Sequence, residues 1–167
     1  MADDNESLAR KEKSFLKDLL IVIPLLFMFI IGFWMLEQTM NSVVILKRDF
    51  VDLAFNLRMD VWRYHDISYA LLWLSYIGFV IREITPWKKG ELTSGRVIIS
   101  LLGFASLTAG LFLSQDVMNA VLILDRAYID YPFFVWKPDL FNARDSARML
   151  IIFGYVGFFA LIRMARR

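Results

Sequence analysis

Two stretches of the sequence decide the fold, because they are near copies of each other: MNSVVILKRDFVD at residues 40–52 and MNAVLILDRAYID at residues 118–130. Seven of the thirteen aligned positions are identical at a constant offset of 78 residues, whereas chance would give about one. An internal duplication explains these matches better than coincidence. Further matches lie outside the two stretches: Gly32 with Gly110, and Tyr76-Ile77-Gly78-Phe79 with Tyr155-Val156-Gly157-Phe158 after a shift of one residue.

Four apolar blocks flank the duplicated stretches. A bilayer core about 30 Å thick needs roughly 20 apolar residues in a helix. Two blocks approach that length and two are shorter, but each shorter block is followed directly by an arginine, Arg82 or Arg163, whose side chain can extend to the interface. We therefore expect all four to span, with a buried or re-entrant course as the alternative for the short ones. The blocks are Leu19–Leu36, Ile67–Ile81, Val97–Leu113 and Met149–Ile162.

The duplication and the blocks together predict an all-α integral membrane protein with four transmembrane helices. Each unit consists of a helix, a segment outside the bilayer and a second helix, so both units cross twice and keep the same orientation. This predicts two tandem parallel helical-hairpin repeats about an axis along the membrane normal. The expected divisions are an N-terminal segment (1–18), repeat 1 (19–82), a loop (83–96), repeat 2 (97–163) and a basic tail (164–167).

The charged residues between the blocks predict the orientation. With both termini cytoplasmic, eleven Lys and Arg lie inside and eight outside, and the net charge is about +4 inside and −2 outside. The positive-inside rule then places the termini in the cytoplasm. The start of the chain, MADDNESLARKEK, is too acidic for a typical mitochondrial presequence. We therefore expect a multi-pass protein of the bacterial inner membrane.

The outside segments carry the duplicated polar residues. Apolar residues recur there at helical spacing, which predicts that the first helix of each unit continues past the membrane surface, in repeat 1 toward Leu57, or bends there and lies along it. In repeat 2, Pro132 stops the helix, and the aromatic stretch 131–138 reads as an interfacial segment. The polar residues kept by both copies are Asn41, Arg48 and Asp52, and Asn119, Arg126 and Asp130.

Arg48 and Asp52 stand four residues apart, as do Arg126 and Asp130, so each pair fits a salt bridge across one helical turn. An exposed pair of this kind adds only a few tenths of a kcal/mol. Its retention in both copies therefore indicates a contact between the two outside segments, a docking surface for another subunit, or a ligand or ion site.

The composition excludes several chemistries. The chain has 58% hydrophobic and 22% charged residues, no cysteine, one histidine and a net charge of +2. Thiolate metal sites, iron–sulfur clusters and cysteine nucleophiles are excluded, and nothing indicates nucleic acid. His65, followed by Asp66, is the single candidate for a cofactor ligand, and an ordinary polar boundary residue is its simpler interpretation. We expect no enzyme, no metal and no resident cofactor, with lipid or pigment left open.

The apolar blocks contain no Asp, Glu, Lys, Arg or His, which argues against an ion-coupled carrier. They contain small residues that let helices approach closely. We expect Tyr76, Gly78, Tyr155, Gly157, Gly103 and Gly110 to mark helix-packing contacts.

These observations favour a non-enzymatic scaffolding subunit of a secretion, conjugation or energy-transducing complex. Its partners would be membrane lipids and other membrane subunits or further copies of the chain. The alternatives are an oligomeric, holin-like pore or passive permease, and an accessory subunit of a pigment or redox complex that uses His65.

Overall fold

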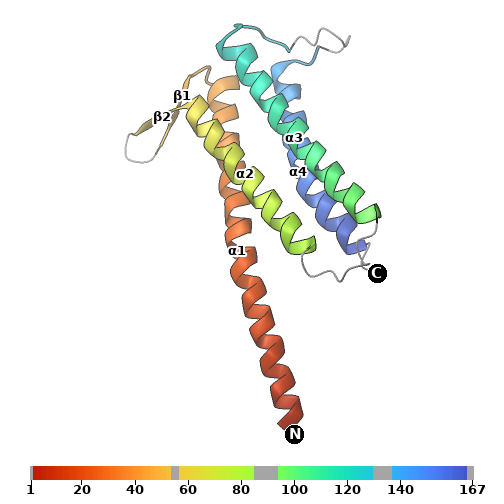
Figure 1. Ribbon diagram of the computed structural model, residues 1–167. Coiled ribbons are helices and arrows are strands. Elements are labelled where there is room, and N and C mark those ends of the chain that lie inside the picture. Colours follow the sequence, from red (N-terminus) through yellow and green to blue (C-terminus); the bar gives the residue numbers. More distant parts are fainter. Residues whose placement is uncertain (1, 54–56, 85–93, 130–136, 165–167) are drawn as a thin grey trace.

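The computed structural model of the chain describes residues 2–53, 57–84, 94–129 and 137–164. It contains four helices and two short strands (Figure 1). In chain order these are α1 (Ala2–Val44), β1 (Phe50–Asp52), β2 (Arg58–Asp60), α2 (Val61–Ile84), α3 (Ser94–Leu122) and α4 (Leu140–Met164).

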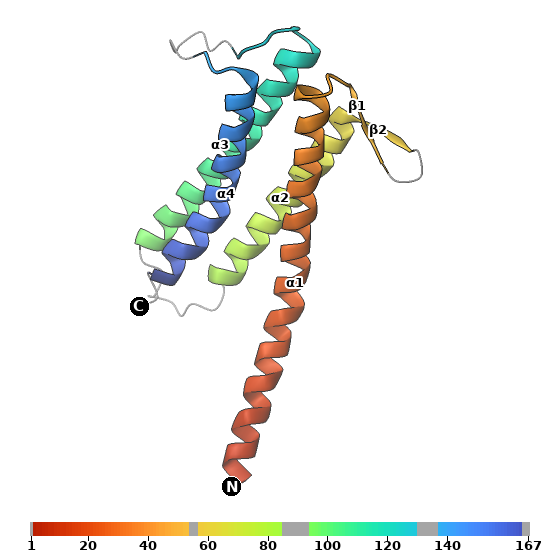
Figure 2. The same ribbon diagram turned by 180° about the vertical axis from the view of Figure 1, so that it is seen from behind.

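The helices form two antiparallel pairs, with α1 packed along α2 and α3 packed along α4. The pairs contact each other much less than the helices within a pair do, and Figure 2 shows the same division from behind. We call the end that carries β1 and β2 the strand end, and the opposite end, where α4 finishes, the terminus end. The first part of α1 extends beyond the other helices on the terminus side.

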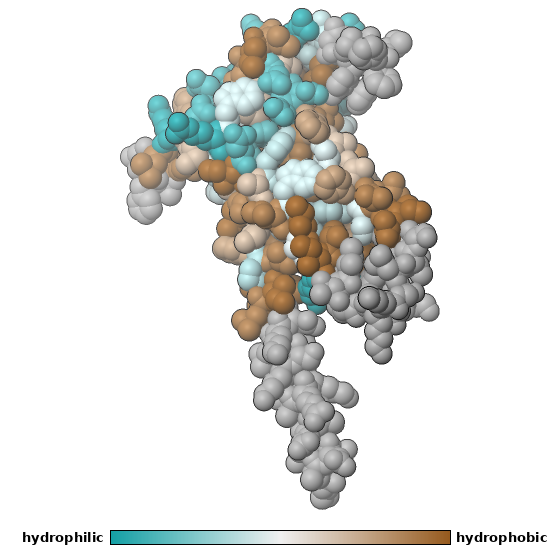
Figure 3. Space-filling view, viewed as in Figure 1, coloured by the Kyte–Doolittle hydropathy of each residue, from teal (hydrophilic) through white to brown (hydrophobic). Residues whose placement is uncertain are grey.

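Three helices are long and apolar enough to cross a membrane, through Leu19–Val44, Val97–Leu122 and Leu140–Arg163. This is compatible with a membrane-embedded protein. The block predicted at 149–162 is thus part of a longer segment, because α4 begins nine residues before it. Apolar residues dominate the middle of the molecule, while hydrophilic residues gather toward the strand end (Figure 3).

The helix that contains the predicted block 67–81 is α2, which has 24 residues. At about 1.5 Å per residue it is roughly 36 Å long. The predicted loop 83–96 overlaps the end of α2 and the start of α3, and residues 85–93 lie outside the described residues.

Both second helices begin with the same cap. One oxygen of the Asp60 carboxylate accepts hydrogen bonds from the backbone N–H groups two and three residues later, at 2.9 and 3.2 Å. Asp139 does the same for α4, at 3.0 and 2.9 Å. Such a cap contributes about 1 kcal/mol. The two caps stand 79 residues apart, the offset that also relates Tyr76 to Tyr155.

The helix α3 ends at Leu122, so the prediction that Pro132 stops the helix of repeat 2 is wrong. The prediction that the first helix continues toward Leu57 is also wrong. The helix ends at Val44, and β1 and β2 pair antiparallel, with Phe50 opposite Asp60. In the second helix pair, an isolated antiparallel bridge joins Tyr128 to Asp139. These are the positions that the offsets of 78 and 79 relate to Phe50 and Asp60. The physical reason is the left-handed turn described below, which no helical periodicity signals.

Glycine allows close approach at one matched point in each pair. A Cβ atom on Gly32 would lie 3.2 Å from the backbone nitrogen of Leu72, and one on Gly110 would lie 3.1 Å from that of Ile151. Leu72 and Ile151 are fully buried and stand 79 residues apart. Each first helix therefore packs directly on the backbone of its partner.

Candidate interaction surface at the strand end

The helices α1 and α3 end in the same left-handed turn. In α1, the carbonyl of Asn41 accepts from the N–H groups of Ile45 and Leu46, at 3.0 and 3.2 Å, and Lys47 has a φ of 50°. In α3, the carbonyl of Asn119 accepts the two corresponding hydrogen bonds, both at 3.1 Å.

The turn in α3 is completed by Asp125, which has a φ of 45°. A further matched hydrogen bond closes each turn. The backbone N–H of Arg48 donates to the carbonyl of Ser42 at 3.0 Å, and the backbone N–H of Arg126 donates to that of Ala120 at 2.8 Å. A positive φ is costly for residues other than glycine. Two such turns at the same offset give the ends of α1 and α3 one backbone conformation.

These turns expose apolar side chains. Ile45 and Leu46 are 55% and 53% exposed, and Ile123 and Leu124 are 67% and 51% exposed. Four large aliphatic side chains in two equivalent positions thus project from the strand end. We call Ile45, Leu46 and Arg48 the first turn surface, and Ile123, Leu124 and Arg126 the second turn surface.

The predicted ion pair of the first copy is present, but not on a helix. Arg48 Nη1 lies 3.1 Å from Asp52, which also contacts Arg58 at 3.3 Å. Both guanidinium groups lie over the Phe50 ring, at 5.5 and 4.5 Å from its centroid. About half of each of the Arg48 and Asp52 side chains is exposed, so the cluster contributes little stability.

For the second predicted ion pair, Arg126 with Asp130, the structure describes only the arginine. Asp130 lies outside the described residues, as does most of the predicted aromatic segment, residues 131–136. Lys137 contacts the Tyr128 ring at 5.5 Å. This contact matches that of Arg58 with Phe50, because residues 58 and 137 stand 79 apart.

A partly buried ion pair joins the two helix pairs. Arg148 of α4 donates two hydrogen bonds to the carboxylate of Glu37 of α1. The Glu37 and Arg148 side chains are 19% and 30% exposed. Beside them, Arg144 Nη1 lies 3.4 Å from the side-chain oxygen of Asn41. Of the predicted interaction residues, Asn41 therefore lies in a contact between helices. Asn119 is half-buried near the end of α3.

A neutral contact joins α2 to α3 at the corresponding place. The Ser114 hydroxyl lies 3.2 Å from His65 Nε2 and 3.2 Å from the Tyr69 hydroxyl. Offsets of 78 and 79 relate position 65 to 144, 69 to 148 and 41 to 119. The α2 residues of one contact thus match the α4 residues of the other in position, with different chemistry, while Ser114 has its counterpart in Leu36.

Sequence reasoning missed Glu37, Arg148, Ser114 and Tyr69. Glu37 directly follows the first apolar block and Arg148 directly precedes the fourth. The sequence therefore marks both Glu37 and Arg148 as charged residues at the ends of apolar blocks on the same side of the predicted membrane. Their pairing was not visible, because it depends on how the two helix pairs cross.

His65 is a buried structural residue in this arrangement. It is 2% exposed, and its ring packs on the Tyr69 ring at a centroid distance of 4.1 Å. Burial lowers the pKa of His65 to about 4, which keeps the imidazole neutral. Asp66 lies 4.0 Å from its Nδ1 and is mostly exposed. Among the described residues, no group of three or more His, Cys, Asp or Glu side chains is placed to hold a metal ion.

The two matched tyrosines are buried between helices. The Tyr155 hydroxyl donates to the carbonyl of Leu72 and lies 2.6 Å from the Ser75 hydroxyl. The Tyr76 hydroxyl donates to the carbonyl of Ser100 at 2.9 Å. The rings lie edge to face at a centroid distance of 5.5 Å, so they contact each other where the two pairs meet.

The four glycines predicted at packing contacts differ in their surroundings. Gly103 faces the backbone oxygen of Gly154, to which an added Cβ would approach within 2.9 Å. Gly110 and Gly78 also face a neighbouring helix, Gly78 against the Leu25 side chain. A Cβ on Gly157 would meet nothing within 4 Å, so Gly157 does not sit at a close contact between the described residues.

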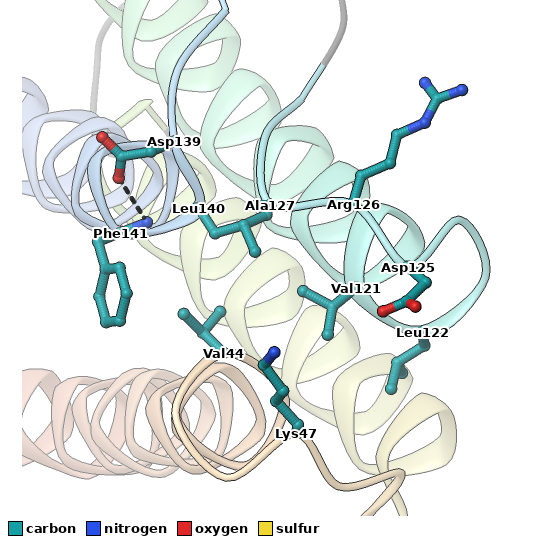
Figure 4. Close-up of a pocket in the computed structure, with 10 residues that line it drawn as sticks. All are labelled: Val44, Lys47, Val121, Leu122, Asp125, Arg126, Ala127, Asp139, Leu140 and Phe141. Carbon is teal, nitrogen blue, oxygen red and sulfur yellow. Dashed lines mark hydrogen bonds between the residues drawn. The ribbon is translucent and has the colours of Figure 1, made fainter.

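A cavity of about 720 Å³ opens between the ends of α1 and α3 and the start of α4. Its lining combines apolar residues such as Val44 and Leu122 with four charged residues. The Lys47 ammonium points into the cavity and the Arg126 guanidinium points away from it (Figure 4). Lys47 and Asp125, the two left-handed residues, both line it. The cavity therefore lies between the two matched turns.

Comparison with known proteins found no family model, no curated relative and no solved structure that matches this chain.

Proposed function

We propose that the chain is a non-enzymatic membrane subunit of the bacterial inner membrane that binds a partner protein through its two turn surfaces. In this proposal it consists of two copies of one helical-hairpin unit in parallel orientation. All four helices cross the bilayer, both termini are cytoplasmic, and the strand end lies outside.

The matched backbone features support the duplication. The left-handed turns and the close-packed glycines recur at an offset of 78, and the aspartate caps and buried tyrosines at an offset of 79. If α2 crosses the membrane as its partner α1 does, the two turns lie on one side of it.

The exposed apolar residues within the two turn surfaces carry the functional proposal. A buried residue retained after duplication is explained by packing, but Ile45, Leu46, Ile123 and Leu124 are more than half exposed. Each copy keeps the same two aliphatic residues followed by an arginine two positions later. Exposed apolar patches mark interaction sites, and arginine is enriched at protein interfaces.

The position of the turns favours protein over lipid as the contact. The last lipid-facing residues before the turns are Trp34 in α1 and Phe112 in α3, 54% and 62% exposed. Ile45 and Ile123 each follow eleven residues later, or about 16 Å along the helix. The headgroup region is only about 5–8 Å thick on each side. In this proposal the turn surfaces, which directly follow the spans that end at Val44 and Leu122, lie at the outer edge of the headgroup region, where a partner protein can reach them.

Quantitative purification tests the proposal. We expect proteins that copurify with the wild type from the native host to be lost from the variant Ile45→Ser/Leu46→Ser/Ile123→Ser/Leu124→Ser. Each double variant should lose part of the same set. Abundance relative to the chain is measured by mass spectrometry after gentle detergent extraction.

Leu57→Ser provides the matched control, because Leu57 is an exposed aliphatic residue near the strands that belongs to neither turn surface. It should keep the copurifying proteins. A wild-type chain that purifies alone, or a quadruple variant that keeps the same partners, would contradict the proposal.

A further inference from the structure

A second cavity, of about 550 Å³, lies between the helix pairs toward the terminus end. One wall is formed by Val22 and Leu26 of α1 and another by Val156, Phe159 and Ala160 of α4. These walls are aliphatic and aromatic. In a chain whose helices span the bilayer, walls of this kind suit a hydrocarbon chain.

A smaller groove, of about 280 Å³, lies at the matched place between α2 and α3. Offsets of 78 and 79 relate its residues to the larger cavity: Ser100 to Val22, Phe104 to Leu26, Ile77 to Val156, Val80 to Phe159 and Ile81 to Ala160. The cavity and the groove thus lie at equivalent places between the two helix pairs. The groove can therefore serve as an internal control for the cavity.

Charge distinguishes the two cavities. The larger one is also lined by Arg82, Glu83 and Arg163, whereas no charged side chain lines the smaller one. Arg82 Nη1 lies 2.8 Å from the buried Glu83 carboxylate. Arg163 is exposed and makes no salt bridge with another described residue. The three side chains sum to a charge of +1 at the mouth of an apolar cavity.

We propose that this cavity binds one anionic phospholipid. An acyl chain lies between α1 and α4, and the headgroup phosphate receives hydrogen bonds from Arg163, with Arg82 adding positive charge. Guanidinium groups suit phosphate oxygens in geometry and charge, and basic pockets between membrane helices hold anionic headgroups. The binding is independent of the partner contact at the strand end.

A lipid titration of the purified chain, followed by native mass spectrometry, tests this assignment. We expect the wild type to hold one phosphatidylglycerol more tightly than one phosphatidylcholine. Arg163→Gln should weaken phosphatidylglycerol binding about fivefold, and Arg163→Lys should weaken it less. Arg63→Gln, which removes an exposed arginine at the opposite end, should leave it unchanged.

Filling each cavity separates the acyl site from a general effect of charge. Ala160→Trp should abolish tight phosphatidylglycerol binding, while Ile81→Trp, at the equivalent position of the smaller groove, should preserve it. The variants must keep the wild-type melting temperature within a few degrees, and a variant that fails this check is replaced by Val156→Trp.

Three results would overturn the proposal. One is equal binding of phosphatidylglycerol by the wild type and Arg163→Gln. Another is equal affinity of the wild type for phosphatidylcholine and phosphatidylglycerol. The last is displacement of the lipid by inorganic phosphate alone, which would indicate a site for free anions.

Discussion

The two places where the helix pairs meet near the strand end have matched backbones and different chemistry. Between α1 and α4, Glu37 and Arg148 form a partly buried ion pair. Between α2 and α3, where His65 and Tyr69 are the counterparts of Arg144 and Arg148, the Ser114 hydroxyl contacts both side chains, and all three groups are neutral. A partly buried ion pair becomes costly when one partner is lost, whereas a neutral hydrogen bond is worth less and is lost more cheaply.

We call the contact between α1 and α4 the ionic crossing and the contact between α2 and α3 the neutral crossing. The difference between them shows which features each crossing needs. The matched caps, turns and glycines set the geometry, so the side chains at the crossing are free to differ as long as every buried polar group has a partner. We therefore expect the two crossings to respond differently to equivalent changes.

The largest effect is expected at the ionic crossing. Glu37→Gln leaves the Arg148 guanidinium with Asp145, at 3.0 Å, as its remaining acidic partner. We expect a loss of about 2 kcal/mol, below the cost for a fully buried pair because both side chains are partly exposed. This corresponds to a fall of roughly 4–8 °C in melting temperature, measured by circular dichroism in detergent.

A double-mutant cycle sharpens this test. The double variant Glu37→Gln/Arg148→Gln should lose clearly less stability than the sum of the losses in the two single variants. In the double variant neither charge of the pair is left without its partner. Asp145→Asn, which alters the exposed partner, should have little effect. A Glu37→Gln variant with the same melting temperature as the wild type would show that the ion pair does not stabilise the contact between α1 and α4.

The neutral crossing should weaken in acid. Since the pKa of His65 is lowered in the folded state to about 4, the unfolded chain binds more protons than the folded chain between pH 6.5 and pH 4. The contribution of neutral His65 to the free energy of unfolding is therefore fully present above pH 6.5. It decreases by about 1.4 kcal/mol per pH unit as the pH falls toward 4.

His65→Gln removes the titrating group and is the comparison. The melting temperature of the wild type should fall more steeply between pH 7 and pH 5 than that of the variant. Parallel pH profiles would contradict a neutral, buried His65.

The smallest effect is expected for Ser114→Ala. This change removes the hydroxyl shared by His65 and Tyr69, at a cost of about 1 kcal/mol, or roughly 2–4 °C in melting temperature. Ser106→Ala, which removes a hydroxyl bonded to the Leu150 carbonyl within the second pair, supplies a control of similar type. An effect at Ser114 larger than that of Glu37→Gln would reverse the ranking of the two crossings.

Sequence periodicity predicted part of this structure. Apolar length located all four helices, and three are long and apolar enough to span. The strands were missed because a left-handed residue such as Lys47 leaves no hydrophobic pattern, and the apolar residues after it fit a helix and a strand equally well.

The candidate site was predicted unevenly. The positions of Arg48, Asp52 and Tyr155 followed from the internal match, whereas Glu37 and Arg148 have no match in charge at positions 115 and 69. A comparison of the two matched halves of the sequence cannot find a contact that only one half makes. Ser114 was hidden for the same reason, because its counterpart is Leu36.

Single-cysteine labelling tests the central claim that the two turns are equivalent and lie on one side of the membrane. The chain has no cysteine, so Ile45→Cys and Ile123→Cys each introduce the single thiol. In intact cells with a permeabilised outer membrane, both should react with a membrane-impermeant maleimide before the inner membrane is broken. Ser94→Cys, at the start of α3, should react only afterwards. Reaction of Ile45→Cys and Ile123→Cys from opposite sides would mean that α2 does not cross, and would contradict the account.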